Sequence, residues 1–201
     1  MTSTSPTGNG AVITTVIAGA TASGGATSAT ASAAKDGAFS AAGLATGQYA
    51  VCVQDPTAGV IDPCLWSDSR TTVGVTAGSL SSGLVVRVKK ASIVSVRLND
   101  TVQALVQRPG DPSPPHVLVG AFDSRGIFHP ANEIQKDATS ISYRIPIPVD
   151  SPIRVIVSSA QVKLTSSTDA PLPAQGYSTT FVQPSSQSVT NSFTFDAVGR
   201  N

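Results

Sequence analysis

The sequence predicts an all-β protein made of two small antiparallel β-sandwich domains in tandem. Short runs rich in Val, Ile and Thr recur about every 8–12 residues, with Gly- or Pro-containing turns between them, as in sandwich folds. Glu occurs once, at Glu133, and Met once, at Met1, so strong helix formers other than Ala are scarce. The 17 Gly and 14 Pro residues interrupt the chain often. Together these features favour strands over helices.

The composition indicates which classes of partner to expect. The 201 residues are enough for one or two domains, each large enough to fold alone. Charged residues make up 12% of the chain, about half of the usual share of roughly 25%. With Lys+Arg 13 and Asp+Glu 12, the net charge of +1 offers no field that would attract nucleic acid. A surface of hydroxyl and amide side chains suits a secreted or cell-surface protein, and we expect no nucleic-acid partner.

The first residues carry no charge as far as Ala34. A signal peptide needs a basic first region, and a membrane span needs about 20 predominantly apolar residues. The apolar run Ala11–Ala20 is short and already contains threonines. We therefore expect no membrane insertion, and we interpret the sequence as a mature chain whose signal was removed. Residues 1–10 are then a flexible N-terminal segment.

Residues 11–90 are expected to form the first sandwich. The run Gln48–Gln54 alternates, which places Tyr49, Val51 and Val53 on one face of a strand. Lys35-Asp36-Gly37 is a turn signal, because Asp-Gly tolerates positive φ. The other strands expected here are Ala11–Ile17, Thr27–Ala33, Ala38–Ser40, Thr71–Thr76 and Leu84–Val88.

Residues 91–201 are expected to form the second sandwich. The Pro-rich segment Gln107–His116 is hostile to any regular element. Pro146 and Pro148 mark Ile141–Ile147 as an edge strand. Ala131–Asp137 is the one segment where we expect a helical turn. The other strands expected here are Ile93–Leu98, Val117–Phe122, Ile153–Val157, Gln161–Leu164, Tyr177–Val182 and Ser192–Ala197. Asp123–Gly126 is expected to be the turn that follows Val117–Phe122.

Two cysteines, Cys52 and Cys64, flank a segment that contains Pro and Gly. This arrangement predicts two strands joined by a long hairpin with a disulfide across it, which would stabilise the fold by about 3 kcal/mol. The alternative is two unrelated buried thiols. We expect no metal site, because these cysteines and the two histidines, His116 and His129, lack the spacing of zinc ligands. A disulfide would place the protein in an oxidising compartment.

The stretch Lys35–Val53, KDGAFSAAGLATGQYAVCV, resembles the D-G-x-F-x-x-x-G-L-x-x-G-x-Y-x-V-x-V pattern of carboxypeptidase regulatory-like domains. The resemblance covers about residues 10–90, and it implies a transthyretin-like (prealbumin-like, Ig-like) sandwich of the kind found in bacterial exported proteins. The segment Asp55–Asp68 is an insertion relative to the pattern. The second half is only faintly similar, through Ile93–Asp100 and Val117–Gly126, and we expect it to be a sandwich of related type.

No catalytic site is predicted. His116 lies in the Pro-rich loop and is interpreted as a solvated residue, whereas His129 precedes Pro130 and is interpreted as ending a strand. There is no G-x-S-x-G elbow and no Gly-rich phosphate loop before a helix. Facing carboxylates are not expected either, because the Asp residues lie mostly in turns. We therefore expect no enzyme and no cofactor.

Trp66 is the residue singled out for contact with a ligand or partner. It lies two positions after Cys64, so it is expected to pack against the disulfide. The alternative is an aromatic platform for a sugar or a protein partner. Asp62 and Asp68, on either side, are interpreted as solvated loop residues.

The predicted function is that of a non-catalytic, exported structural or adhesive module of a bacterial cell-surface or secreted protein, with a protein or glycan partner at the cell surface. A second hypothesis is self-assembly into an extracellular filament, in which the uncharged strand Ala11–Ile17 joins the sheet of another copy. A third is a carbohydrate-binding module that uses Trp66.

Overall fold

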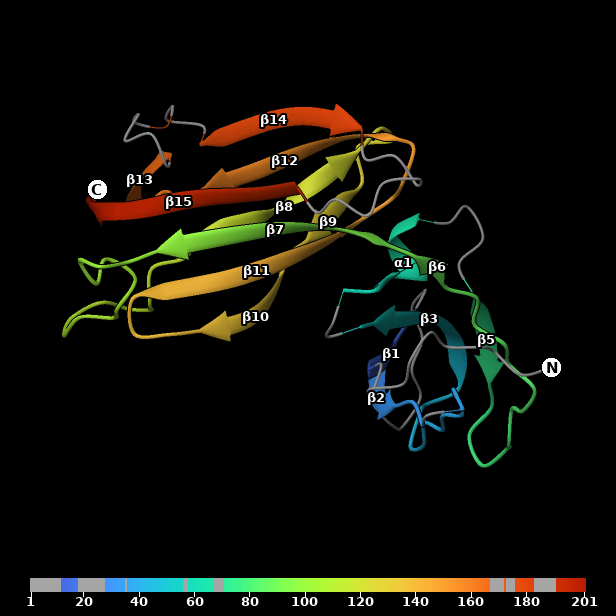
Figure 1. Cartoon of the computed structure of the whole chain (residues 1–201). Helices are drawn as coiled ribbons and strands as arrows, with labels where there is room; N and C mark the ends of the chain where they lie inside the picture. The colour runs from blue at the N-terminus through green and yellow to red at the C-terminus, as the bar shows by residue number, and fades with distance from the viewer. Residues whose placement is uncertain are drawn as a thin grey trace. The chain divides into compact units, whose positions relative to one another are not determined.

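The computed structural model is all-β apart from one four-residue helix (Figure 1). It describes residues 12–17, 28–34, 36–55, 58–66, 71–166, 172, 176–182 and 191–201, and of residues 12–17, 65 and 66 the backbone alone. The predicted flexible segment, residues 1–10, lies outside this range. Contacts divide the chain into two compact units, Met1–Lys90 (unit 1) and Ala91–Asn201 (unit 2). No helix among the described residues is long and apolar enough to cross a membrane.

Unit 1 contains a four-stranded antiparallel sheet in the order β2-β1-β3-β5 and a two-stranded pair, β4-β6. The strands of the larger sheet are β1 (Val12–Ile17), β2 (Ser28–Ser32), β3 (Gly47–Gln54) and β5 (Thr72–Val75). The pair consists of β4 (Val60–Ile61) and β6 (Lys89–Lys90), and the short helix α1 spans Pro63–Trp66.

Strand β3 provides the core of unit 1. Its alternating sequence buries Tyr49, Val51 and Val53, as the sequence predicts, and leaves Gln48 and Gln54 exposed. Tyr49 also donates its hydroxyl hydrogen to the carbonyl oxygen of Ala45 at 2.8 Å, so its one polar atom is paired inside the core. The opposite face of β3 is only partly solvated, because it also carries the buried Ala50 and the half-buried Cys52.

Two segments of unit 1 that were expected to be strands are not. The prediction for Ala38–Ser40 is wrong, because these residues follow a tight turn and form no ladder. The prediction for Leu84–Val88 is wrong in the same sense. Its alternation is nevertheless real, because Leu84 and Val88 pack with Phe39 against the core cluster around β3. Period-two burial thus needs an extended chain, but it does not need a paired one.

Unit 2 is built from two sheets that share one core, in a sandwich-like arrangement (Figure 1). The five-stranded sheet has the order β10-β11-β7-β15-β13, with β7 (Ser92–Asn99), β10 (Asn132–Lys136), β11 (Ser140–Ile147), β13 (Val162–Ser166) and β15 (Asn191–Arg200). The four-stranded sheet has the order β14-β12-β8-β9, with β8 (Leu118–Asp123), β9 (Phe128–Pro130), β12 (Pro152–Ser158) and β14 (Tyr177–Val182).

The core of unit 2 lies between these sheets. It takes inward side chains from both, such as Leu98 and Phe195 from the larger sheet and Val155 from the smaller one. Tyr177 on β14 packs edge-on to Phe195 with ring centroids 4.9 Å apart, which ties the two layers together. Strand β15 pairs in parallel with β7, whereas every other described strand pair is antiparallel.

Two predictions for unit 2 need correction. The helical turn expected at Ala131–Asp137 is wrong, because this segment forms β10, in which Glu133 pairs with Tyr143 of β11. The edge position expected for Ile141–Ile147 is wrong for the strand as a whole, because β11 lies between β10 and β7. The proline signal does hold locally. The pairing with β10 ends at Arg144, so among the described strands Pro146 pairs with β7 alone and faces no partner on its other edge.

Candidate functional site

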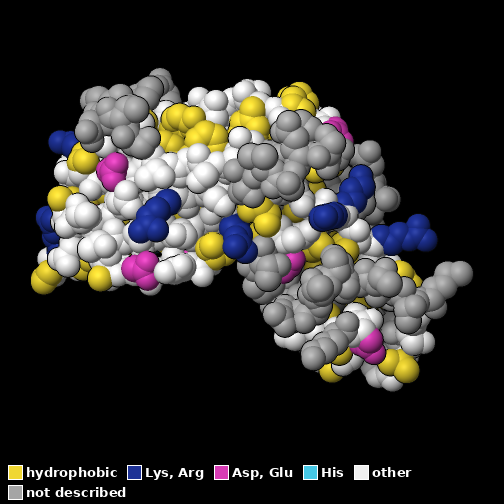
Figure 2. All heavy atoms as spheres, in the orientation of Figure 1, with side chains coloured by type: hydrophobic (Ala, Val, Ile, Leu, Met, Phe, Trp, Pro, Cys, Tyr) yellow, Lys and Arg dark blue, Asp and Glu magenta, His cyan; other side chains and the backbone are white. Residues whose placement is uncertain are grey.

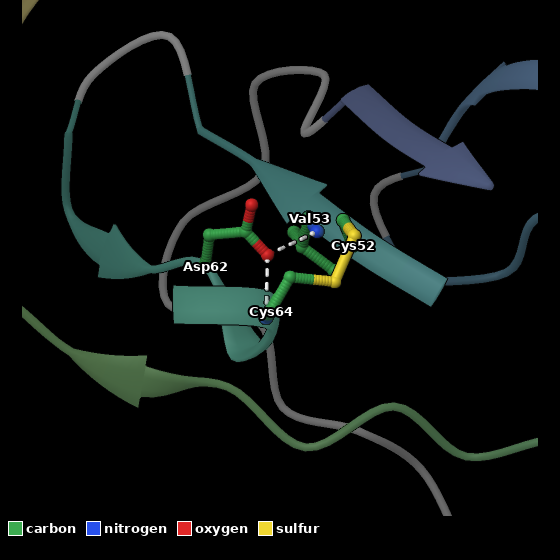
Figure 3. Close-up of a disulfide and its surroundings, with 4 residues drawn as sticks. All are labelled: Cys52, Val53, Asp62 and Cys64. Carbon is green, nitrogen blue, oxygen red and sulfur yellow. Dashed lines mark hydrogen bonds between the residues drawn. A yellow bond between two sulfur atoms is a disulfide. The ribbon is translucent and has the colours of Figure 1, made fainter. Parts of the chain in front are cut away.

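The predicted disulfide is present in unit 1 and links Cys52 to Cys64, with the two Cα atoms 5.3 Å apart (Figure 3). Cys52 lies in β3, as expected. Cys64 lies in helix α1, so the expected hairpin of two strands is wrong. The bond therefore fastens a short helix onto the sheet rather than one strand onto another.

Asp62 determines where this helix begins. Its Oδ1 accepts hydrogen bonds from the backbone N–H groups of Cys64 at 2.9 Å and Val53 at 3.1 Å (Figure 3). The bond to Cys64 is an N-cap, and Pro63 takes the first helical position, where its missing N–H is no loss. The bond to Val53 connects the cap to β3. The expectation that Asp62 is a solvated loop residue is therefore wrong.

The environment of Asp62 is partly apolar. Burial raises the pKa of its carboxyl, while the N–H groups of Cys64 and Val53 act in the opposite direction. The carboxylate also lies within 4.8 Å of both cysteine sulfurs, a grouping that could hold a metal ion if the thiols were free. In the oxidised protein the sulfurs are bonded to each other, so this cluster is a covalent and hydrogen-bonded anchor for α1.

Trp66, the predicted contact residue, is the last residue of α1. Its side chain lies outside the described residues, as does the whole of Asp68. The disulfide at Cys64, two positions earlier, fixes the backbone from which the Trp66 side chain projects. Packing on the disulfide and a role as a partner platform therefore both stay predictions.

The two histidines occupy different environments. His116 is exposed, and its backbone holds the loop before β8 through a bond from its N–H to Gln161 and one to its carbonyl oxygen from Ser159. His129 is fully buried in β9, with Nε2 at 3.3 Å from Oδ2 of Asp123. Because an ionised carboxylate only accepts, Nε2 carries the hydrogen, and Nδ1 has no hydrogen-bond partner among the described residues.

Asp123 is the centre of this second cluster. Its Oδ1 accepts the backbone N–H groups of Arg125 at 2.9 Å and Ile127 at 3.0 Å, and its Oδ2 accepts the Arg125 guanidinium at 2.7 Å. These bonds close the predicted turn at Asp123–Gly126, where Gly126 has φ of +79°. The turn was predicted from the sequence, but the burial of Asp123 and its contact with His129 were not.

The charges of this pair follow from its surroundings. Burial acts to raise the pKa of Asp123, but hydrogen bonds from Arg125, Ile127 and His129 outweigh it and hold the pKa below its ordinary value. Burial lowers the pKa of His129, and the attraction of Asp123 offsets this only in part. At neutral pH the pair is thus a carboxylate and a neutral imidazole. With His129 at 0% exposure, neither ring nitrogen is open to a substrate, and the cluster supports a turn.

The described part of the surface carries few charges. Figure 2 shows more Lys and Arg than Asp and Glu side chains on this face, and white and yellow atoms make up most of its described part.

The chain matches no family model, no curated protein and no solved structure.

Proposed function

We propose that the chain is a non-catalytic, exported structural or adhesive module of a bacterial cell-surface or secreted protein. The observation that supports this best is the Cys52–Cys64 disulfide, because stable disulfides belong to oxidising compartments. Three carboxylates support the non-catalytic part of the proposal, of which Asp100 and Asp123 are buried and Asp62 is partly buried. Each accepts backbone N–H groups and so serves a turn or a cap.

The finer fold assignment is part of this proposal. We infer two tandem sandwiches of the Ig-like or prealbumin-like kind, with the first related to carboxypeptidase regulatory-like domains. For unit 2, support comes from two sheets around one core. For unit 1, support comes from the buried positions Tyr49, Val51 and Val53, which match the apolar positions of the family pattern.

The test of the proposed function is the assembly state of the full chain, followed by its retention on surfaces. Light scattering after size exclusion should give a monomer of 20.3 kDa. The monomer should then be retained on at least one member of a panel of immobilised glycans and matrix proteins. Retention on none of them, or turnover of ester, peptide or glycoside substrates by the purified chain, would contradict the proposal.

A filament subunit is the second candidate, and the position of β1 bears on it. Strand β1 pairs along its length with both β2 and β3, so it fills an interior place in its own sheet. Exchange between copies would put the same strand of a neighbour into that place. Deleting β1 is therefore a poor test, because it also removes an interior strand from the monomer.

A cross-link gives a sharper test of strand exchange. Thr15 of β1 and Ala29 of β2 are register partners, so the variant Thr15→Cys/Ala29→Cys should tie β1 to its own chain. Peptide mapping without reduction verifies the pairing. If wild type forms fibres by exchange, the oxidised variant should remain monomeric and regain assembly on reduction. Fibres from the oxidised variant, or a wild type that never assembles, would refute exchange.

A carbohydrate-binding site at Trp66 is the third candidate. The observation that favours it is the anchoring of α1, which ends at Trp66, by the disulfide and by the Asp62 cap. A binding aromatic loses less entropy when its backbone is already ordered. Trp66→Ala should then abolish glycan retention while the melting temperature changes little. Unchanged retention would rule this site out.

A further inference from the structure

The outer face of the sheet β14-β12-β8-β9 in unit 2 has a distinctive composition. Along each strand, buried residues of the core alternate with residues that point away from it. Among the outward residues of these strands, Arg154 on β12 has the only charged side chain. The others are apolar, hydroxyl-bearing or glycine, such as Leu118 at 51% exposure and Thr180. The outward residues of these described strands therefore form a partly apolar surface with one cation and no carboxylate among them.

Arg154 belongs to a row of side chains that crosses the sheet. In the strand register, Arg154 is opposite Thr180 on one side and Phe122 on the other, and Phe122 is opposite Phe128. The Arg154 guanidinium carbon lies 5.1 Å from the centroid of the Phe122 ring, within the range of a cation–π contact. The rings of Phe122 and Phe128 are themselves 5.1 Å apart and tilted by 52°. The cation is thus supported by aromatic rings rather than by an acid.

Gly120 makes room for this row. A Cβ atom at position 120 would lie 2.3 Å from Cζ of Phe128 and 2.7 Å from the carbonyl oxygen of His129. The Phe128 ring therefore lies directly over the backbone of β8, in the space that any larger residue would fill. Neither Phe122 nor Phe128 is among the side chains packed on the core of unit 2. Both half-buried rings belong to the outer face.

The hydrogen-bonding capacity of Arg154 is unused within the described chain. Its side chain is exposed, and the contact with Phe122 is its only interaction with a described residue. By contrast, Arg97, Arg125 and Arg200 all donate to side-chain or backbone oxygens. A guanidinium has five N–H donors arranged to bind a carboxylate through two parallel bonds. Stacking on Phe122 holds it ready for such a ligand.

We propose that this outer face binds an acidic polysaccharide whose sugar rings carry carboxylates, with Arg154, held on the Phe122 ring, binding a carboxylate and Phe128 contacting the apolar face of a sugar ring. The proposal rests on the adhesive role inferred above and names its partner class. A polysaccharide suits the face better than an acidic protein segment, because β12 and β14 carry outward hydroxyls at Ser158, Ser178 and Thr180. A hydroxyl both donates and accepts, so it can exchange hydrogen bonds with the hydroxyls of a sugar ring.

The experiment measures binding of the full chain to polygalacturonate, a polymer with one carboxylate per sugar ring, by calorimetry and by retention on the immobilised polymer. Arg154→Gln should weaken binding at least tenfold, while Arg154→Lys should recover only part of it because an ammonium lacks the bidentate geometry. Lys163→Gln is the matched control. It removes one exposed cation from the other sheet of unit 2 and should change binding less than twofold.

Two further probes identify what is recognised. Methyl-esterified polygalacturonate keeps the sugar rings but loses the charge, and it should bind at least tenfold more weakly. Polyglutamate keeps the charge without the rings, and it should compete poorly. Equal competition by polyglutamate would mean that an acidic peptide is recognised instead, which would overturn the proposal. Equal losses in Arg154→Gln and Lys163→Gln would also overturn it, because they would indicate unspecific attraction.

Failure of this inference is distinguishable from failure of the adhesive role. If wild type ignores polygalacturonate but is retained on another surface of the panel, the polysaccharide proposal is wrong and the adhesive role stands. If it is retained on nothing, both are wrong. Arg154 is exposed, so Arg154→Gln should unfold at the same urea concentration as wild type, which shows that any loss of binding is local.

Discussion

The Asp123 carboxylate and the His129 imidazole lie 3.3 Å apart inside unit 2, with side-chain exposures of 2% and 0%. A buried carboxylate is tolerated when donors surround it, and Asp123 receives them from Arg125, Ile127 and His129. The contact therefore couples the turn that follows β8 to β9. Removing the Asp123 carboxylate leaves the buried Nε2 of His129 without its partner, whereas Arg125 still donates to Oδ2 of Asp123 when His129 is removed.

Replacing Asp123 by Asn should lower the free energy of unfolding of unit 2 by about 2 kcal/mol, because hydrogen bonds to a charged group contribute about 1.5–3 kcal/mol. Urea denaturation followed by circular dichroism measures the loss, and hydrogen exchange of peptides from β8 and β9 locates it. Asp137→Asn is the control, since Asp137 is exposed and its bonds to Gln135 and Ser140 are local. Equal effects of the two substitutions would show that burial of Asp123 is unimportant.

The stability of unit 2 should fall as the pH decreases from about 6.5. Burial holds the folded pKa of His129 below its ordinary value of 6.5, so in this range the unfolded chain binds more protons than the folded chain. Each proton bound only on unfolding lowers stability by up to about 1.4 kcal/mol per pH unit. For Asp123 the folded pKa is also below its ordinary value of 3.8, so its contribution to stability is complete above that value and is lost only at lower pH.

Urea midpoints measured between pH 7 and pH 5 check this dependence. His129→Gln should flatten the slope, because the amide does not titrate and still offers Asp123 a donor. His116→Gln is the matched control, because it makes the same replacement at an exposed position. A slope that survives in His129→Gln would assign the proton uptake to another group.

Loss of the disulfide should destabilise unit 1 by about 3 kcal/mol, which is the value expected for a cross-link between two residues 12 positions apart in the sequence. The variant Cys52→Ser/Cys64→Ser and the reduced wild-type chain should lose similar amounts in urea denaturation. Dithiothreitol should have no effect on the double variant. Unit 2 is the internal reference, and its hydrogen exchange should stay the same in both.

The stability of unit 1 should depend more on the hydrogen-bond acceptor of the Asp62 side chain than on the negative charge of that side chain. Asp62→Ala removes the acceptor for Cys64 and Val53 and should lower the stability of unit 1 by about 1 kcal/mol, as is usual for N-caps. Asp62→Asn keeps an oxygen in place, and because burial raises the pKa of Asp62, loss of the charge should cost less than loss of the acceptor. Thermal unfolding of the two variants measures the difference. A larger loss in Asp62→Asn would show that the charge dominates.

Local patterns were sufficient for much of the strand content. The alternation of β3 and of β12 is visible in the sequence because one face of each strand meets the core, so the signal needs no knowledge of the neighbouring strand. The disulfide could also be predicted from the sequence, since two cysteines allow only one pairing. The wrong predictions concern segments whose strand or non-strand state depends on pairing with another strand. Ala131–Asp137 becomes β10 because β11 offers it a partner, and Leu84–Val88 lacks an assigned ladder although its residues alternate.

The sequence by itself determined that this protein is all-β, that Cys52 and Cys64 are joined, and that Asp123–Gly126 is a turn, because each depends on residues close together or on composition. Only the tertiary structure decided that β15 pairs in parallel with β7 and that Asp123 meets His129 inside the core. It also decided that Arg154, Phe122 and Phe128 form one row. These contacts join different strands, and their register follows from how whole sheets pack, which no local pattern encodes.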